Sequence, residues 1–339
     1  MHEIRFCRME EKKELQDFIK KHWKDNHVFT YDTSLLDNQH LDKEKGRYNF
    51  IIAENKQTHE IDAILGFIPT SHYDSNSNVE NIWLAIWKVK DRYKSTGIGL
   101  ELYLKLQRVY ANASVGVVGI SEDASKIYKA FRYKTGYLDH FYIKNNAITD
   151  KGIMIFDDAI YECKEKNVSI TLKKISFSDL EKGNLNCTVS PFKTKEYFLN
   201  KYLTNGSYNY LLYGFFRRNQ LISVFVARII RLNESKCMRI VDWMGSFPKK
   251  CHDQYHDLIV SENCEYVDML CHVPNKDDIL DMGFYLKNPE LTTIPNYFEP
   301  FVSENIDIRY AFKSHSKEYF IFKGDSDQDR PNITEQVLP

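Results

Sequence analysis

Short runs of β-branched and aromatic residues recur along the chain, separated by polar turns and by stretches long enough for helices. Residues 3–20 alternate between apolar and polar positions and then become amphipathic, which predicts a strand followed by a helix, and residues 169–182 repeat this pattern. Residues 47–69 and 207–229 each predict two strands around a polar turn. Two similar series of elements therefore follow one another along the chain.

The series continue in the same order, with a third strand, a helix-length stretch, a fourth strand, a second helix and closing strands. In the first series the later strands are expected at 81–89, 113–121 and 136–144, and in the second at 237–245, 265–273, 283–288 and 318–322. Such self-similarity is typical of duplicated units. A single large mixed sheet with accidental similarity between its halves is the alternative.

We therefore expect an α/β (α+β) fold of tandem units, each a mixed central sheet flanked by helices. The first unit spans residues 1–150 and the second spans 168–332. Residues 151–167 form a linker or a strand added to the first sheet. A length of 339 residues fits two domains better than one, because a single core stops growing at about 250–300 residues.

Composition narrows the class of protein. Hydrophobic residues make up 43% and charged residues 27% of the chain, as in globular proteins, and the net charge of −1 gives no bulk attraction to nucleic acid or to anionic membranes. No apolar stretch reaches the roughly 18 residues that span a bilayer, and the first residues are charged rather than signal-like. Seven scattered cysteines without a CxxC pair indicate reduced thiols and no metal site. We expect a cytoplasmic monomer or homodimer.

Only the first series contains a glycine loop, "KSTGIG" at 94–99, between an apolar strand and an apolar helix. Gly97 and Gly99 permit a tight turn and a close approach to the backbone. The first N–H groups of the helix have no intrahelical acceptor, so a bulky anion such as a pyrophosphate fits there, with Lys94 adding charge. An ordinary helix start with two incidental glycines is the alternative.

The spacing of the glycines excludes two common phosphate loops. A Walker loop needs a Lys after its last glycine, and a dinucleotide-binding loop needs a third glycine where Leu102 stands. The loop of the GCN5-related N-acetyltransferase superfamily, [QR]-x-x-G-x-[GA] after the fourth strand, is the remaining candidate. Residues 94–99 resemble it, with Lys94 in place of Arg or Gln. Ala124 and Tyr128 on the next helix match that family's small residue and tyrosine.

This resemblance implies an acyl-coenzyme A donor, with no metal. It implies a bulge near Trp87 to Val89 that frees an N–H for the thioester carbonyl, and a Tyr128 that protonates the leaving sulfur, unless Tyr128 only packs in the core. His72 and Asp242 are candidates for the catalytic base. The residues expected at the donor are Trp87, Lys88, Val89, Lys94, Ser95, Thr96, Gly97, Ile98, Gly99, Leu100, Ser121 and Ala124.

The acceptor would lie against the second, degenerate unit. Residues 21–40 are crowded with His, Trp and Tyr, and residues 322–332 carry an Asp-Gln-Asp-Arg run, although both segments would also suit ordinary surface. Together they resemble the two-domain nucleotide-sugar N-acyltransferases of bacterial surface-polysaccharide pathways, above all the type that transfers 3-hydroxybutyryl to dTDP-3-amino-3,6-dideoxygalactose. The resemblance implies an acetyl or 3-hydroxybutyryl donor, and it implies acceptor contacts from His22, His27, Tyr31, Asp329 and Arg330.

Two rival functions stay open at this point. Peptidoglycan aminoacyltransferases also carry two such units, but they take aminoacyl-tRNA and would need a basic surface and a long helical arm, which neither the net charge nor a heptad pattern indicates. A catalytically silent acyl-coenzyme A-binding module is the other. The alternating Asp325, Asp327 and Asp329 resemble a calcium loop only faintly, because the glycine and final glutamate of such a loop are missing.

Overall fold

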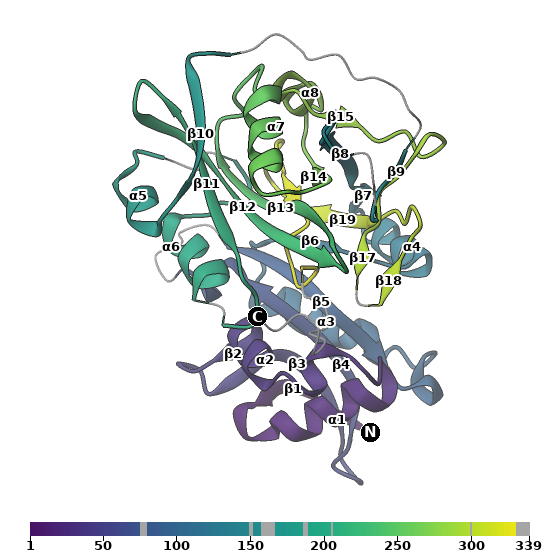
Figure 1. The fold of residues 1–339 in the computed structure, drawn as a ribbon. Coiled ribbons are helices and arrows are strands. Elements are labelled where there is room, and N and C mark those ends of the chain that lie inside the picture. Colours follow the sequence, from purple (N-terminus) through teal and green to yellow (C-terminus); the bar gives the residue numbers. More distant parts are fainter. Residues whose placement is uncertain are drawn as a thin grey trace.

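The chain folds as two mixed β-sheets flanked by helices, in a computed structural model (Figure 1). The model describes residues 1–74, 80–148, 152–156, 167–185, 189–204, 206–298 and 300–329. The predicted α/β class with tandem sheets is confirmed. No helix among the described residues is long and apolar enough to cross a bilayer.

The first sheet has the strand order β1-β3-β4-β5-β6-β19-β7, with β2 beside β3, and its only parallel neighbours among these strands are β5 and β6. Its strands are β1 (His2–Arg8), β2 (Leu41–Asp42), β3 (Arg47–Asn55), β4 (Ile61–Pro69), β5 (Asn81–Val89), β6 (Ser114–Val118), β7 (Lys134–Tyr137) and β19 (Arg309–Lys313). The helices of this half are α1 (Lys12–His22), α2 (Thr33–His40), α3 (Ile98–Val109) and α4 (Glu122–Ala130), with short 3-10 turns at Met9–Glu11, Val28–Thr30, Thr70–His72 and Asp91–Tyr93.

Period-two alternation along β3 decides which helices cover which face of this sheet. Phe50 and Ile52 pack with the apolar side chains of α1 and α2. Ile51 and Ala53 point the other way and pack with α3 and with Tyr128 of α4. Both faces are therefore buried, which explains why β3 and β4 read as nearly continuous apolar runs.

The second sheet has the order β10-β11-β12-β13-β14-β8-β15, with β20 beside β14. Its strands are β8 (Asp139–Lys144), β10 (Ile170–Ile175), β11 (Leu211–Arg217), β12 (Gln220–Leu232), β13 (Ser235–Gly245), β14 (Tyr266–His272), β15 (Tyr285–Leu286) and β20 (Ile321–Phe322). The helices are α5 (Phe177–Lys182), α6 (Lys195–Phe198) with a π turn at Leu199–Leu203, α7 (His252–Ser261) and α8 (Asp277–Met282). Two small hairpin-like pairs join β9 (Ile155–Phe156) to β16 (Thr292–Thr293) and β17 (Tyr297–Phe298) to β18 (Phe301–Val302).

The two halves exchange strands. The stretch 136–144, expected as one closing strand of the first unit, is split: β7 ends at Tyr137 in the first sheet, and β8 pairs with β14 in the second. In return β19, from the second half of the sequence, lies between β6 and β7. Each sheet is thus completed by a strand from the other half, so the units in space are not the contiguous halves of the sequence.

Residues 151–167 were expected to form a linker or to add a strand to the first sheet. Their one described strand, β9, pairs with β16 and not with the first sheet, so the added-strand version of that prediction is wrong for these residues. Residues 151 and 157–166 lie outside the described part of the chain.

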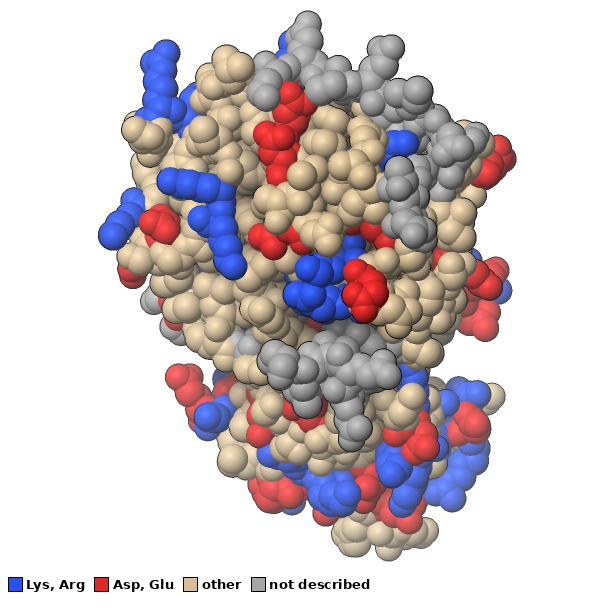
Figure 2. Space-filling model, viewed as in Figure 1, with Lys and Arg blue, Asp and Glu red and all other residues tan. Residues whose placement is uncertain are grey.

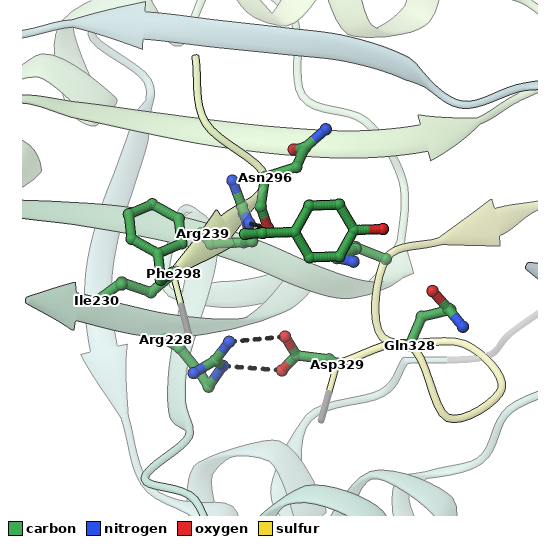
Figure 3. Close-up of a pocket in the computed structure, with 9 residues that line it drawn as sticks. Arg228, Ile230, Arg239, Asn296, Phe298, Gln328 and Asp329 are labelled. Atoms are coloured by element: carbon green, nitrogen blue, oxygen red, sulfur yellow. Dashed lines mark hydrogen bonds and ion pairs between the residues drawn. The ribbon is translucent and has the colours of Figure 1, made fainter. Parts of the chain in front are cut away.

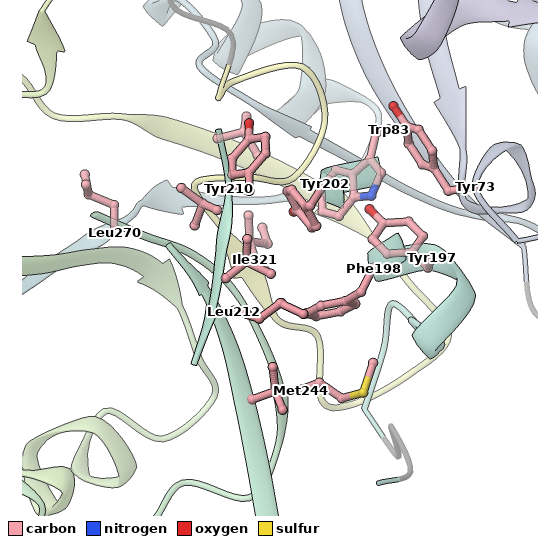
Figure 4. Close-up of a cluster of buried hydrophobic side chains, with 14 of the residues drawn as sticks. Tyr73, Trp83, Tyr197, Phe198, Tyr202, Tyr210, Leu212, Met244, Leu270 and Ile321 are labelled. Carbon is pink, nitrogen blue, oxygen red and sulfur yellow. The ribbon is translucent and has the colours of Figure 1, made fainter. Parts of the chain in front are cut away.

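An aromatic core joins the two halves (Figure 4). It contains Tyr73 and Trp83 from the first half and Tyr197 and Tyr202 from the second. A Cβ at Gly116 would lie only 2.6 Å from the hydroxyl oxygen of Tyr319, so β6 needs a glycine where the second half docks against it. The halves therefore share one core, and their relative placement is fixed by packing.

Candidate functional site

Strands β5 and β6 pair along only part of β5 and then diverge. Their parallel pairing runs only from Asn81 to Leu84 on β5. Just beyond, two residues of β5, Ala85 and Ile86, face the single Gly66 of β4, which is a β-bulge. The bulge was expected near Trp87 to Val89, and it lies slightly before these residues. A bulge leaves a peptide group outside the regular ladder, and here that peptide group lies where the two strands diverge.

A cavity of about 910 Å³ occupies the space between the diverging strands. Its walls are the second half of β5, the end of β6, and the first turns of α3 and α4. A pocket of this size accommodates a cofactor-sized ligand. It lies at the carboxyl ends of two adjacent parallel strands, which is where α/β sheets bind ligands.

The two glycines of the loop have different roles. Gly97 is the N-cap of α3, has a positive φ of 82° and provides no side-chain cap, and a Cβ there would meet nothing within 4 Å. Gly99 is instead tightly packed, since its Cβ would lie 3.2 Å from Val89 and 3.4 Å from the indole nitrogen of Trp87. Gly97 therefore makes the turn, and Gly99 lets the helix start approach β5, with N–H groups free for a ligand.

Basic side chains border the cavity. Lys94 and Lys88 both contact Asp91, at 2.9 and 3.4 Å, and Lys24 of the loop after α1 lies on the other side. The three lysines line the cavity, whereas Asp91 does not. A negatively charged ligand at the start of α3 would thus meet both the helix dipole and these ammonium groups.

Tyr128 reaches the cavity from α4 but is almost fully buried, at 2% exposure. Its ring packs edge-on to Trp87 and lies 5.2 Å from Tyr133. Burial raises the pKa of Tyr128 well above its ordinary value. The phenol therefore stays protonated at neutral pH and can donate a proton.

Most of the residues expected at the donor do line this cavity: Trp87, Lys88, Val89, Lys94, Gly97, Gly99, Leu100, Ser121 and Ala124. Ser95, Thr96 and Ile98 do not. Ser95 and Thr96 are exposed on the loop. Ile98, at the start of α3, packs in the hydrophobic core between α3 and the first sheet. Ser121 also caps α4, accepting a hydrogen bond from the N–H of Ala124.

The two candidate bases lie elsewhere. His72 is packed inside the first half, with Nε2 2.7 Å from the carbonyl of Asn38, and burial lowers its pKa. Asp242 is fully buried, 2.6 Å from the Lys193 ammonium, and accepts a hydrogen bond from Tyr202. Neither lines the cavity. The buried ion pair accounts for Asp242, whereas His72 is only half-buried, and a role as base stays a prediction for both.

The segment after α1 contributes unevenly. His27 lines the cavity, and its Nδ1 accepts a hydrogen bond from the N–H of Phe29. Trp23 lines the cavity as well, although the sequence did not single it out as a site residue. His22 lies in a separate hollow near Lys90, and Tyr31 is half exposed and lines no part of the cavity.

Residues 322–332 were expected to face the acceptor, through Asp329 and Arg330, with an ordinary surface segment as the alternative. The 321–329 segment instead runs through the middle of the molecule. Gly324 donates to the carbonyl of Val241 in the second sheet, and the Ser326 hydroxyl donates to the carbonyl of Leu84 in the first. Asp327 and Gln328 line the cavity. Arg330 lies outside the described residues.

A smaller pocket adjoins the cavity and shares Tyr297 and Gln328 with it (Figure 3). Arg228 forms a bidentate ion pair with Asp329 at its edge, with both contacts at 2.8 Å. Lys323 and Arg239 also line it, and the Lys323 ammonium lies 5.7 Å from the centre of the Tyr297 ring. Figure 2 shows Lys and Arg side chains gathered beside acidic ones in a hollow near the middle of this face.

Two of the three alternating acids of the same segment are paired with cationic side chains. No group of three or more His, Cys, Asp or Glu side chains in the described part of the chain is arranged to hold a metal ion. Asp325 pairs with Lys193 at 2.8 Å, and Asp329 pairs with Arg228. Both are occupied by cationic side chains of the protein itself.

Comparison with known proteins identifies the fold. No protein-family model and no curated protein matches the chain. Among solved structures, a GCN5-related N-acetyltransferase from Anabaena variabilis ATCC 29413 superposes with a TM-score of 0.55 at 13% identity, over 92% of this chain and 72% of that one. A conserved protein of unknown function from Enterococcus faecalis V583, described as a probable N-acyltransferase, gives 0.51 at 11% identity, over 87% and 73%. The chain thus shares the fold of these proteins.

Proposed function

We propose that the chain is an acyl-coenzyme A-dependent N-acyltransferase. The observation that carries the proposal is the cavity between β5 and β6, which combines a bulge at Ala85–Ile86 with an uncapped helix start at Gly97. The fold shared with the Anabaena protein makes the same reaction class a natural expectation.

The cavity suits the parts of an acyl-coenzyme A in turn. Its pyrophosphate would accept hydrogen bonds from the first N–H groups of α3, beside Lys94 and Lys88. Its pantetheine would lie along β5 beyond Leu84, where β6 no longer occupies the strand edge, and would bond to the backbone as an added strand does. This arrangement would bring the thioester to the bulge.

The chemistry then needs a donor for the oxyanion and an acid for the leaving group. A backbone N–H freed at the bulge would stabilise the negative charge on the carbonyl oxygen. The acceptor nitrogen forms a bond to the carbonyl carbon, the carbon–sulfur bond breaks, and the Tyr128 hydroxyl gives its proton to the departing sulfur. The raised pKa of Tyr128 keeps that proton in place until it is needed.

For the acceptor we propose an amino sugar linked to a nucleoside diphosphate, with dTDP-3-amino-3,6-dideoxyhexoses as the first candidates and acetyl or 3-hydroxybutyryl as the acyl group. The smaller pocket supports this choice. It adjoins the cavity and is lined by Arg228, Arg239 and Lys323, of which Arg228 is paired with Asp329 and Arg239 with Asp268. A diphosphate would lie against Lys323, and Tyr297 gives a ring for a base to stack on.

Titration calorimetry of the purified protein with coenzyme A tests the donor site, with Gly99→Val as the variant. The valine side chain would collide with Val89 and Trp87 and push the helix start away, so we expect binding by the wild type and at least a tenfold loss in the variant. Gly206→Ala, where a Cβ meets nothing within 4 Å, is the matched control and should bind normally. No heat of binding with the wild type would refute the donor assignment.

Mass spectrometry of products then tests the reaction, using acetyl- and 3-hydroxybutyryl-coenzyme A with a panel of dTDP-, UDP- and GDP-linked amino sugars. Expected is a product heavier by the acyl group with one dTDP-linked amino sugar. Coenzyme A binding without any product across the panel would favour a silent binding module over an enzyme.

A further inference from the structure

We propose that Asp327 is the general base that takes the proton from the acceptor's ammonium group. The inference rests on the proposed function and names another residue for the step for which the sequence offered His72 and Asp242. It places a catalytic group of the first sheet's cavity on a segment that belongs to the second half of the chain.

The position of Asp327 is set by its neighbour. The Ser326 hydroxyl donates to the carbonyl of Leu84 at 2.7 Å, and Leu84 is the last β5 residue that pairs with β6. Asp327 follows directly in the chain and lines the same cavity as Ala85 and Ile86, the two residues of the bulge. The thioester carbonyl would lie at this bulge.

The flanking acids hold the segment rigidly. Asp325 is fully buried against the Lys193 ammonium and accepts a hydrogen bond from the N–H of Phe322. Asp329 is bound by the Arg228 guanidinium and by the Tyr210 hydroxyl. Asp325 and Asp329 therefore anchor the segment to the second half of the molecule. Asp327, between them, lines the cavity of the first half. A base held between two anchors has little freedom to swing away.

The other acidic group of the cavity is unsuited to this step. Asp123 stands in the first turn of α4 with its side chain 89% exposed, and it pairs with Lys126 at 3.1 Å. It lies on the α4 side of the cavity, four residues beyond Gly119 and away from the bulge. A solvated carboxylate away from the reacting atoms cannot take the amine's proton.

The histidine and the tyrosine of the cavity are unsuited as well. His27 accepts a hydrogen bond at Nδ1 from the N–H of Phe29, which requires the tautomer that carries its proton on Nε2. In that form the ring donates to a ligand and does not accept from it. Tyr128 carries its proton at neutral pH, as tyrosine ordinarily does, so it can serve as the acid and not as the base. Asp327 remains.

The step balances without any further reactant. The Asp327 carboxylate takes one proton from the acceptor ammonium, and the neutral nitrogen attacks the thioester carbon. As the carbon–sulfur bond breaks, Tyr128 gives its proton to the sulfur and coenzyme A leaves as the thiol. The nitrogen then loses its second proton through cavity water to the Tyr128 phenolate, and Asp327 releases its proton to solvent, so each turnover frees one proton; the water path is the natural route because both residues line one cavity.

The polar and titratable groups packed around Asp327 come from several elements. They are Gln328, whose amide nitrogen lies 3.4 Å from Oδ1, the anchors Asp325 and Asp329 with Lys193 and Arg228, the buried Tyr73, whose pKa Asp327 contributes to raising, and His27 and Tyr128 across the cavity.

The test compares wild type, Asp327→Asn and the surface variant Asp17→Asn with acetyl-coenzyme A and dTDP-3-amino-3,6-dideoxygalactose. We expect at least a 100-fold loss of kcat in Asp327→Asn at pH 7, with unchanged coenzyme A affinity and melting temperature. In that variant kcat/KM should climb about tenfold per pH unit, since only amine already neutral in solution can react. Asp17→Asn removes one carboxylate from an exposed pair and should behave as wild type.

Hydroxylamine as the acceptor separates a base from a residue that merely shapes the site. Its nitrogen is neutral at pH 7 and needs no base, so Asp327→Asn should form acetohydroxamate within a few-fold of the wild-type rate. Equal loss with both acceptors, or full activity of Asp327→Asn with the amino sugar at pH 7, would overturn the proposal. Absence of coenzyme A binding by the wild type would instead refute the proposed function itself.

Discussion

Each sheet contains one pair of parallel strands that diverges at a bulge. The space between the diverging strands is open in the first sheet and filled in the second. In the first sheet β5 and β6 separate after Leu84 and leave the cavity. In the second sheet, the pairing of β13 with β14 ends at Ile240, and the next residue, Val241, is the extra residue of a bulge. There β20 bonds to β14, and Gly324 donates to Val241, so the chain's own segment fills the gap.

This difference shows that a ligand site in such a sheet depends on what the chain inserts as well as on its own residues. The same 321–329 segment closes the gap of the second sheet and then lines the open gap of the first with Asp327. The second sheet thus has its gap filled by this segment, which also brings the Asp327 side chain to the cavity of the first sheet. The experiments below aim at one gap or the other.

The largest loss of stability is expected from Lys193→Met, which acts on the segment that fills the gap in the second sheet. Lys193 neutralises two fully buried carboxylates, Asp242 at 2.6 Å and Asp325 at 2.8 Å. Its removal leaves uncompensated buried charge, which costs about 3–5 kcal/mol of unfolding free energy. Urea unfolding measures the loss, and hydrogen exchange at Gly324 should accelerate before exchange in β5.

The matched control is Lys249→Met, because the Lys249–Asp281 pair is exposed and its loss should leave the unfolding free energy nearly unchanged. Equal stability of the two variants would mean that the segment is not held by this network.

The open gap is tested next by Tyr128→Phe. The ring stays packed against Trp87 and Tyr133, so the fold and coenzyme A affinity should be unchanged. Loss of the proton donor should lower kcat about 10²-fold. Steady-state kinetics with a fixed acceptor measures it. Tyr137→Phe, on an exposed tyrosine of β7, serves as the control. Wild-type kcat in Tyr128→Phe would remove the residue from the mechanism.

His140 lies on β8, the strand from the first half of the chain that pairs in the second sheet. A variant at His140 therefore tests the boundary between the two halves. Burial lowers its pKa to about 4, although its Nε2 lies 2.8 Å from Asp268. The unfolded chain, with an ordinary value near 6.5, binds the proton first, so stability falls as pH drops from about 6.5 to 4. This group contributes a slope of up to about 1.4 kcal/mol per pH unit.

We expect His140→Asn to flatten that slope in urea unfolding between pH 7 and 5, whereas the exposed His315→Asn should leave it unchanged. Parallel curves for wild type and His140→Asn would show that this boundary does not titrate in this range.

The smallest effect is expected at the mouth of the open gap. Lys94 is largely exposed and already pairs with Asp91 at 2.9 Å, so its attraction for a pyrophosphate is screened. Lys94→Ala should weaken coenzyme A binding about three- to fivefold at low salt and less at high salt, and Lys94→Arg should bind at least as well as wild type. Calorimetry at two salt concentrations decides it, and a salt-independent loss would contradict an electrostatic role.

The sequence predicted what local patterns determine. Alternating apolar runs predicted the strands, and the glycine spacing together with Tyr128 predicted one wall of the cavity. The register of β5 against β4 is set by long-range pairing, so the bulge lay outside the predicted position. Asp242 was expected only as a candidate base, and nothing local in the sequence indicates its ion pair with Lys193.

The wall formed by Asp327 and Gln328 was the part that the sequence did not reveal. Its position follows from the exchange of β8 and β19, which brings together residues far apart in sequence. No periodicity in a polar stretch such as residues 324–329 indicates that it is buried, because its burial depends on Lys193, Arg228 and the Leu84 carbonyl, all on distant elements.

The exchange of β19 has a consequence for how the protein is made. The β6 strand must wait for β19 until nearly all of the described chain has left the ribosome, which at ordinary translation rates is on the order of ten seconds or more. During that interval the apolar β6 presents an unpaired edge to any other strand nearby. A nascent chain should therefore need chaperone shelter at this edge, and it gains the ability to bind its donor only as one of the last events of folding.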